Sequence, residues 1–141
     1  MHTDNLSKTA IKHFRFLKKY NYRQISIVED TWFTKVEYVN LDVGIGIEII
    51  LDFRDTVVSV LICKLINNKI FDGYRYNNQD VKYYLVEVLR ILKKSDQRVK
   101  MVRNFKISKE DFIGDIERKA TSLFEIISDE NVNSFNDLFN N

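Results

Sequence analysis

Residues 43–53 carry an apolar side chain at every odd position, whereas Gly44, Gly46, Glu48 and Asp52 occupy even positions. A period of two is typical of a β-strand with one buried face, because a helix would spread the same residues around its whole circumference. The pattern therefore predicts one strand of an antiparallel sheet. It constrains the architecture and leaves the chemistry open.

Further strands are predicted on both sides of this segment. Residues 32–39 precede it, and residues 57–66 follow it. The latter segment is apolar on both faces, which indicates a central strand with something packed on each side. Residues 23–29 are predicted as a first strand and residues 70–76 as an edge strand. Short turns at 54–56 and 67–69 make the whole arrangement a meander.

The first long hairpin has a testable register. A tight turn at Leu41 and Asp42 places Tyr38 opposite Ile45 on the buried face and Lys35 opposite Glu48 on the other face. This register pairs apolar with apolar and positive with negative side chains. Cross-strand pairs of this kind contribute about 0.2–1 kcal/mol each.

Three segments are predicted to be helices because apolar residues recur in them at helical spacing. They are residues 7–20, with Asp4, Asn5 or Ser7 as the cap, residues 79–93, and residues 108–128, where Ser108 and Asp111 resemble a capping box. Residues 134–140 are predicted to add one short helical turn. The predicted buried residues of the three helices are Ala10, Ile11, Phe14, Leu17, Val81, Tyr84, Leu85, Val88, Leu89, Leu92, Phe112, Ile113, Ile116, Ala120, Leu123, Phe124 and Ile127.

The order of these elements predicts a single α+β domain over residues 1–141. It consists of an N-terminal helix, a four- to five-stranded antiparallel meander sheet, and two C-terminal helices packed on one face. The 141-residue length and 45% apolar content are sufficient for a core without disulfides or metal.

Composition also bears on compartment and partners. The lone cysteine, Cys63, excludes an intramolecular disulfide and fits a reducing compartment. The first twenty residues lack an apolar signal-peptide core, and no run approaches the roughly 18 apolar residues of a membrane span. We therefore expect a cytoplasmic protein without a membrane partner. A formal net charge of +2 does not by itself imply nucleic acid.

Few residues suggest catalysis. His2 lies near the terminus, His13 is predicted to lie beside the apolar face of a helix, and Cys63 belongs to the most apolar strand. Buried cysteines usually behave as small hydrophobic residues. No His, Cys or carboxylate spacing typical of a metal site is present, and Gly44 and Gly46 form only a short GxG without a following helix. We expect no cofactor, and we expect these glycines to mark a bulge or a place where an aromatic residue or a helix packs on the strand.

The carboxylates Glu37, Glu48 and Asp52 are predicted to share the polar face of the sheet. Paired carboxylates perform glycoside chemistry when held about 5–10 Å apart. A small hydrolase using these residues is therefore one hypothesis. The alternative is an ordinary solvated sheet face on which Lys35 neutralises Glu48.

Two surface features suggest a binding partner. Residues 93–106 are basic, whereas the last predicted helix is acidic. The two segments either neutralise each other, or the basic one forms a patch that binds an acidic protein or a phosphate backbone. Tyrosines surround the start of the second predicted helix, and we expect Tyr83 and at least one of Tyr74 and Tyr76 to be exposed. Tyr and Arg are enriched at interfaces. The candidate partner-binding residues are Lys93, Lys94, Arg98, Lys100, Arg103, Tyr74, Tyr76 and Tyr83.

The N-terminal half of the chain resembles small bacterial immunity proteins encoded beside polymorphic or contact-dependent toxins. The resemblance covers residues 7–66, and the residues that carry it are 14–17, Tyr20, Tyr22, 36–40 and 45–49. It implies a non-enzymatic protein that binds one cognate toxin and blocks it. Binding residues vary among such proteins, so none is carried over. Immunity proteins against nuclease toxins are commonly acidic, so the slightly basic charge here favours an acidic or non-nuclease target.

These observations give three hypotheses. The first is a non-enzymatic protein-binding module of immunity type. The second is a nucleic-acid-binding or regulatory domain that uses residues 93–106 and the basic N-terminal helix, and the third is the small hydrolase. An exposed edge strand, either residues 23–29 or 70–76, would also allow two copies to pair as a dimer.

Overall fold

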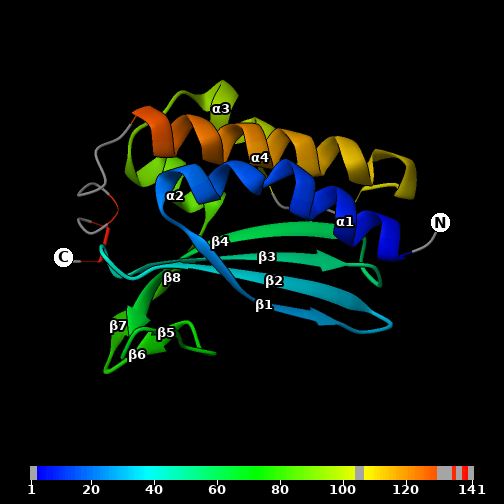
Figure 1. The fold of residues 1–141 in the computed structure, drawn as a ribbon. Coiled ribbons are helices and arrows are strands. Elements are labelled where there is room, and N and C mark those ends of the chain that lie inside the picture. The colour runs from blue at the N-terminus through cyan, green and yellow to red at the C-terminus, as the bar shows by residue number, and fades with distance from the viewer. Residues whose placement is uncertain (1–2, 104–106, 130–134, 136–137, 140–141) are drawn as a thin grey trace.

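The chain folds into a layer of helices over one face of an antiparallel sheet (Figure 1). The computed structural model describes residues 3–103, 107–129, 135, 138 and 139. Its helices are α1 (Thr3–His13), the 3-10 helix η1 (Arg15–Tyr20), α2 (Leu85–Ile91), α3 (Asp96–Met101), the 3-10 helix η2 (Lys109–Asp111) and α4 (Phe112–Asp129). Its strands are β1 (Arg23–Glu29), β2 (Phe33–Asn40), β3 (Ile45–Asp52), β4 (Val57–Ile66), β5 (Lys69–Ile70), β6 (Arg75–Tyr76), β7 (Gln79–Asp80) and β8 (Lys82–Tyr84). The predicted α+β class is confirmed.

The sheet is a meander in which β1, β2, β3 and β4 lie in chain order. The far edge of β4 pairs with β8 along its middle and with β5 at its end. β4 is therefore a central strand, as its apolar residues on both faces predict. β6 and β7 form a separate two-stranded ribbon.

The β2–β3 hairpin differs from the predicted register by two residues. Tyr38 lies opposite Ile47, and Glu37 rather than Lys35 lies opposite Glu48. Because side chains alternate with a period of two, a shift of two residues keeps every side chain on its predicted face. The predicted faces are therefore correct, but the predicted cross-strand partners are wrong.

A longer turn causes this shift. The chain reverses over residues 41–44, and the Gly44 N–H donates to the Asn40 carbonyl at 3.0 Å. Gly44 has a φ of +72°, a backbone conformation that residues with a Cβ adopt only at a cost. The glycine therefore permits a four-residue turn in place of the two-residue turn expected at Leu41 and Asp42.

The main core lies between the sheet and the helices. In α1 and η1 the predicted residues Ala10, Phe14 and Leu17 are buried. Ser7 lies inside α1, not at its cap, and its hydroxyl donates to that of Thr34 at 3.0 Å. The helix therefore begins before the predicted start, at residue 3. The buried residues that β2, β3 and β4 contribute to this core are Val36, Tyr38, Ile45, Ile47, Ile49, Leu51, Val58, Val60 and Ile62.

The predicted helix over residues 79–93 is correct only in its second half. Its first half forms β7 and β8, and β8 pairs with Leu61–Cys63 of β4. The free edge of the apolar strand β4 pairs readily with a segment that contains β-branched and aromatic residues, such as β8. This pairing between strands outweighs the helical spacing of the apolar residues in the same segment. The short helix α3, inside the basic segment, was not predicted.

The last helix forms close to its predicted bounds. Ser108 donates to the Asp111 carboxylate at 2.9 Å, a contact between side chains and not the expected capping box. Ile113 and Phe124 are 41% and 42% exposed, although both were predicted to be buried, and Ile126 is buried instead. Of the predicted turn over residues 134–140, only Phe135, Leu138 and Phe139 are described, and all three are buried.

Candidate functional site

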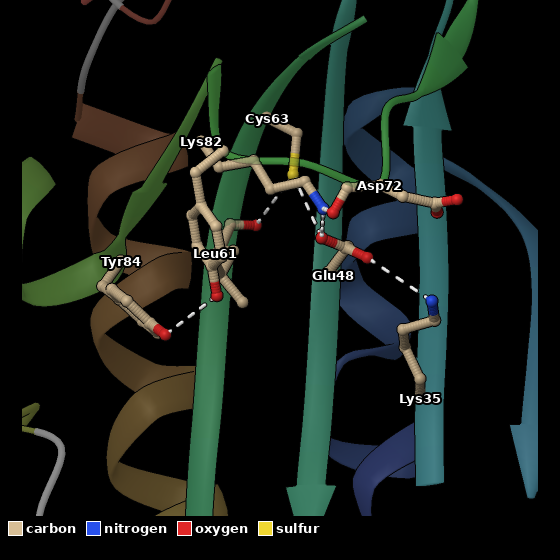
Figure 2. Close-up of polar contacts among 8 residues, drawn as sticks. Lys35, Glu48, Leu61, Cys63, Asp72, Lys82 and Tyr84 are labelled. Atoms are coloured by element: carbon tan, nitrogen blue, oxygen red, sulfur yellow. Dashed lines mark hydrogen bonds and ion pairs between the residues drawn. The ribbon is translucent and has the colours of Figure 1, made fainter. Parts of the chain in front are cut away.

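A group of polar side chains is packed on the sheet face opposite the helices. We call it the polar cluster, and it consists of Lys35, Glu37, Glu48, Cys63 and Lys82. These residues come from β2, β3, β4 and β8, which the pairing of the strands brings side by side. Figure 2 shows Glu48 lying between the two lysines.

The strongest contact of the polar cluster is a buried ion pair. Lys82 Nζ lies 2.6 Å from Glu48 Oε1, and the two side chains are only 6% and 3% exposed. Lys35 Nζ lies 3.9 Å from the other Glu48 oxygen, so the predicted pairing of these two residues occurs as a longer, diagonal contact. Lys82 also donates to the Asp72 carbonyl at 3.5 Å. Breaking a pair of this kind leaves one charge buried without a partner.

Residues 67–80, which we call the covering segment, lie over the sheet face opposite the helices and bury the end of that face that carries the polar cluster. β5, β6 and β7 lie on the opposite side of the sheet from the helices (Figure 1). Ile70 sits over Gly46, where an added Cβ would lie 2.7 Å from the Ile70 side chain. The predicted bulge, aromatic residue or helix at Gly46 is therefore wrong: the strand is regular there, and the aliphatic Ile70 of β5 packs over the glycine. The buried apolar residues beneath or beside the segment and outside the main core are Val39, Leu61, Cys63, Leu65 and Val81.

The two carboxylates of the polar cluster influence each other. Burial raises the pKa of the Glu37 carboxyl above its ordinary value of 4.5, and the hydrogen bond with Glu48 raises it further. Lys35 acts in the opposite direction. Glu37 therefore holds its proton to a higher pH than a solvated glutamate does.

Cys63 lies beside the same carboxylate. Its Sγ is 3.7 Å from Glu48 Oε1, and its side chain is fully buried. Burial raises the pKa of the Cys63 thiol, and the negative charge of Glu48 raises it further. A protonated, buried thiol is a poor nucleophile. Cys63 thus matches the predicted behaviour of a small hydrophobic residue.

The three sheet carboxylates are not brought together. Glu37 and Glu48 are direct neighbours, but Asp52 lies four residues further along β3. The Asp52 side chain accepts a hydrogen bond from the Asp55 N–H at 2.8 Å and so stabilises the β3–β4 turn. The expected solvated face is also wrong, because Glu48 is buried under the covering segment.

The candidate basic residues differ in their contacts and in their exposure. Arg98, in α3, lies 3.3 Å from the Glu125 carboxylate of α4, so this residue joins two helices. Lys93, Lys100 and Arg103 are exposed, and Lys94 is half-buried. Residues 104–106 of the predicted basic segment lie outside the described residues. His13 pairs with Glu117 at 3.7 Å, and His2 is not among the described residues.

The candidate tyrosines fall into two environments. Tyr74 and Tyr76 are 51% and 36% exposed, as predicted for at least one of them. Tyr83 is half-buried rather than exposed, because its ring stacks on Phe139 at 5.4 Å. Tyr84, predicted to lie in a helix core, ends β8, and its hydroxyl lies 3.1 Å from that of Tyr74.

Sequence reasoning missed a second buried ion pair. Lys119 of α4 donates to the Asp115 carboxylate at 2.9 Å and to the backbone carbonyl of Val58 in β4. Burial lowers the pKa of Lys119, whereas Asp115 opposes that shift. The four-residue spacing of Asp115 and Lys119 could have predicted an ion pair on one face of the helix, but it could not have predicted its burial, because such pairs are usually exposed.

No group of three or more His, Cys, Asp or Glu residues within the described ranges is arranged to hold a metal ion. None of the described helices is both long and apolar enough to cross a membrane. No protein-family model, curated protein or solved structure matches this chain.

Proposed function

We propose that this chain is a non-enzymatic protein-binding module of immunity type, which binds a cognate toxin and blocks it. The observation that carries the proposal is a band of exposed apolar side chains on and beside the edge strand β1. The sequence resemblance to immunity proteins supplies the kind of partner. We define the edge band as Ile25, Ile27, Val28 and Trp32.

The edge band is exposed at every one of its positions. Ile25, Ile27 and Val28 are 46%, 40% and 42% exposed, and Trp32, in the following turn, is 58% exposed. β1 pairs only with β2 among the described strands, so its outer backbone edge has no strand beside it in that part of the chain. Isolated apolar residues on a surface are ordinary, but several along one sheet edge are typical of an interaction surface.

The chemistry of the edge band favours a protein partner. Aliphatic β-branched side chains present area for burial, and Trp is among the residues that most often dominate the binding energy of interfaces. The Arg54 guanidinium lies 5.9 Å from the centre of the Trp32 ring and adds a cation beside it. An extended segment of a partner can also add to the free edge of β1 by main-chain hydrogen bonds.

Affinity capture tests this proposal. The tagged protein is used to capture partners from its native host, with and without nuclease, and captured proteins are identified by mass spectrometry. We expect one stoichiometric protein that survives nuclease treatment, is toxic when expressed alone and is neutralised by co-expression. Loss of all captured material with nuclease would instead support the nucleic-acid hypothesis, and capture of no protein would contradict the proposal.

Two matched variants assign the surface. Val28→Lys places a charge in the edge band and should abolish capture. Ile113→Lys makes the same type of change at a position of α4 with equal exposure, 41% against 42%, and should leave capture intact. Equal losses in both variants would show that the edge band is not the binding surface.

A further inference from the structure

A cleft opens at the corner where β4, β8 and α2 meet the chain that follows α3. We call it the arginine cleft; its volume is about 440 Å³, within the range of about 300–1,000 Å³ that small-molecule sites occupy. The residues that line it are Val57, Ser59, Tyr84, Val86, Arg90 and Arg103. It contains Arg103 of the predicted basic segment but also Arg90, which lies outside that segment.

The charges of the arginine cleft are unbalanced. Arg90 and Arg103 are both exposed, and neither guanidinium has a hydrogen bond or an ion pair with any described residue. None of the described residues that line the cleft is an aspartate or glutamate. Two like charges that line one concave surface repel each other, and a bound anion removes that repulsion.

The donors and walls of the cleft define the ligand. A guanidinium presents N–H groups in a planar fork that matches the oxygens of a phosphate. The Ser59 hydroxyl has no hydrogen-bond partner among the described residues and adds a further donor. Val57, Val86 and the Tyr84 ring give the cleft apolar walls beside these polar groups.

We propose that the arginine cleft binds a small phosphorylated molecule, with its phosphate on Arg90, Arg103 and Ser59 and its organic part against Val57, Val86 and Tyr84. This site lies on β4, β8 and α2, at the other side of the sheet from the edge band on β1, so it goes beyond the proposed function. A small ligand fits better than a nucleic acid, because a phosphate backbone needs a row of cations, whereas only two arginines are among the described residues that line this cleft.

Titrations monitored by NMR on the full chain test the proposal. The probes are adenosine 5′-monophosphate, inorganic phosphate, adenosine, and a single-stranded DNA oligonucleotide. We expect saturable, one-to-one shifts of the Ser59 and Arg90 amides with the monophosphate, weaker binding of inorganic phosphate, and no shifts with adenosine. Absence of saturable shifts up to about 10 mM of either phosphate probe would overturn the proposal.

Variants of the two arginines test whether their side chains bind the phosphate group. Arg90→Gln and Arg103→Gln should each weaken binding of the monophosphate by about tenfold, the effect of losing one charge-assisted hydrogen bond. Arg23→Gln removes an exposed arginine of β1 and should leave the affinity unchanged. Equal affinity in all three variants would overturn the assignment. Tighter binding of the oligonucleotide, with a steep loss of affinity in salt, would also overturn it in favour of nucleic acid.

Discussion

At the scale of single residues, the fold changes the acid–base chemistry of Glu37. Its carboxyl lies opposite Glu48, and burial together with that neighbour raises its pKa. Between the ordinary value of 4.5 and the raised value, the folded protein binds more protons than the unfolded chain. The free energy of unfolding therefore falls as pH rises through this interval, and the loss is complete above the raised pKa.

Glu37→Gln removes this loss. The amide cannot ionise, and it still donates a hydrogen bond to Glu48 at every pH. We expect the variant to be more stable than the parent protein at pH 7 and to approach it at a pH below the ordinary glutamate range. Thermal unfolding at both pH values measures the difference. Glu37→Ala, which lacks the donor, should give a smaller gain; a gain for Glu37→Gln that does not change with pH would contradict the explanation.

Gly46 gives a steric prediction. In Gly46→Ala the new Cβ would meet the Ile70 side chain at 2.7 Å, so that side chain must shift. Overpacking of this kind costs about 1–3 kcal/mol in the free energy of unfolding, measured by denaturant titration. An added Cβ at Gly44 meets no atom within 4 Å, so Gly44→Ala should cost only the strain of its positive φ, about 1 kcal/mol. A smaller cost of Gly46→Ala in an Ile70→Ala background, which lacks both contacting carbons, would confirm that Ile70 is the obstacle.

From the sequence, the sheet face on which each side chain lies could be predicted better than the residue that stands opposite it on the next strand. Alternation over residues 43–53 correctly separated the buried face of β3 from its polar face. It did not reveal that Glu48 is buried, because its closest partner, Lys82, comes from a segment that has helical spacing. The turn length decides which residues stand opposite each other, and Gly44 makes that turn longer than expected.

At the scale of elements, the covering segment is held by the ion pair between Glu48 and Lys82. The pair joins β3 to β8, and Lys82 reaches the Asp72 carbonyl within the segment itself. The Tyr74 ring lies with its centre 5.8 Å from the same ammonium group. These contacts connect the segment to the sheet at the point where Cys63 is buried. Exposure of Cys63 therefore reports the opening of this element.

Glu48→Gln leaves the Lys82 ammonium buried without its counter-ion. Because removing one partner of a buried pair costs about 3–5 kcal/mol, we expect a large fall in the free energy of unfolding and faster modification of Cys63 by a thiol reagent. Lys82→Met should behave similarly. The double variant Glu48→Gln/Lys82→Met should recover much of the stability. If the two single losses simply add in the double variant, the pair does not act as a unit.

The predicted helix failed to form over residues 79–84 for one physical reason. Residues 79–84 have apolar residues at helical spacing, and no local signal distinguishes them from the helix that follows. Their strand conformation comes from pairing with the edge of β4, a contact between segments far apart in the sequence. In contrast, α4 formed near its predicted bounds, whereas the predicted helix over residues 7–20 formed as α1, which begins earlier and ends at His13, followed by the 3-10 helix η1.

At the scale of the whole molecule, the fold divides its sheet into two unequal surfaces. The helices cover one face completely enough to bury the residues of the main core, whereas the covering segment protects only one end of the other face. The edge band on β1 lies at the side of the sheet away from both β5 and β8. This separation leaves β1 accessible without any change in the core, which is what a partner surface requires.

The same edge would allow two copies of the chain to pair through β1, and we expect this pairing to be weak. The β1–β2 register shifts between Gln24 and Ser26, and a bulge of this kind leaves only Ser26–Glu29 regular enough for a continuous ladder. So short a contact falls below the roughly 1,000 Å² that a stable interface buries. Sedimentation velocity should therefore find a monomer at concentrations up to about 100 μM. A stable dimer that Val28→Lys dissociates, and Ile113→Lys does not, would show that the edge band binds a second copy, and its residues would then not be free for a toxin.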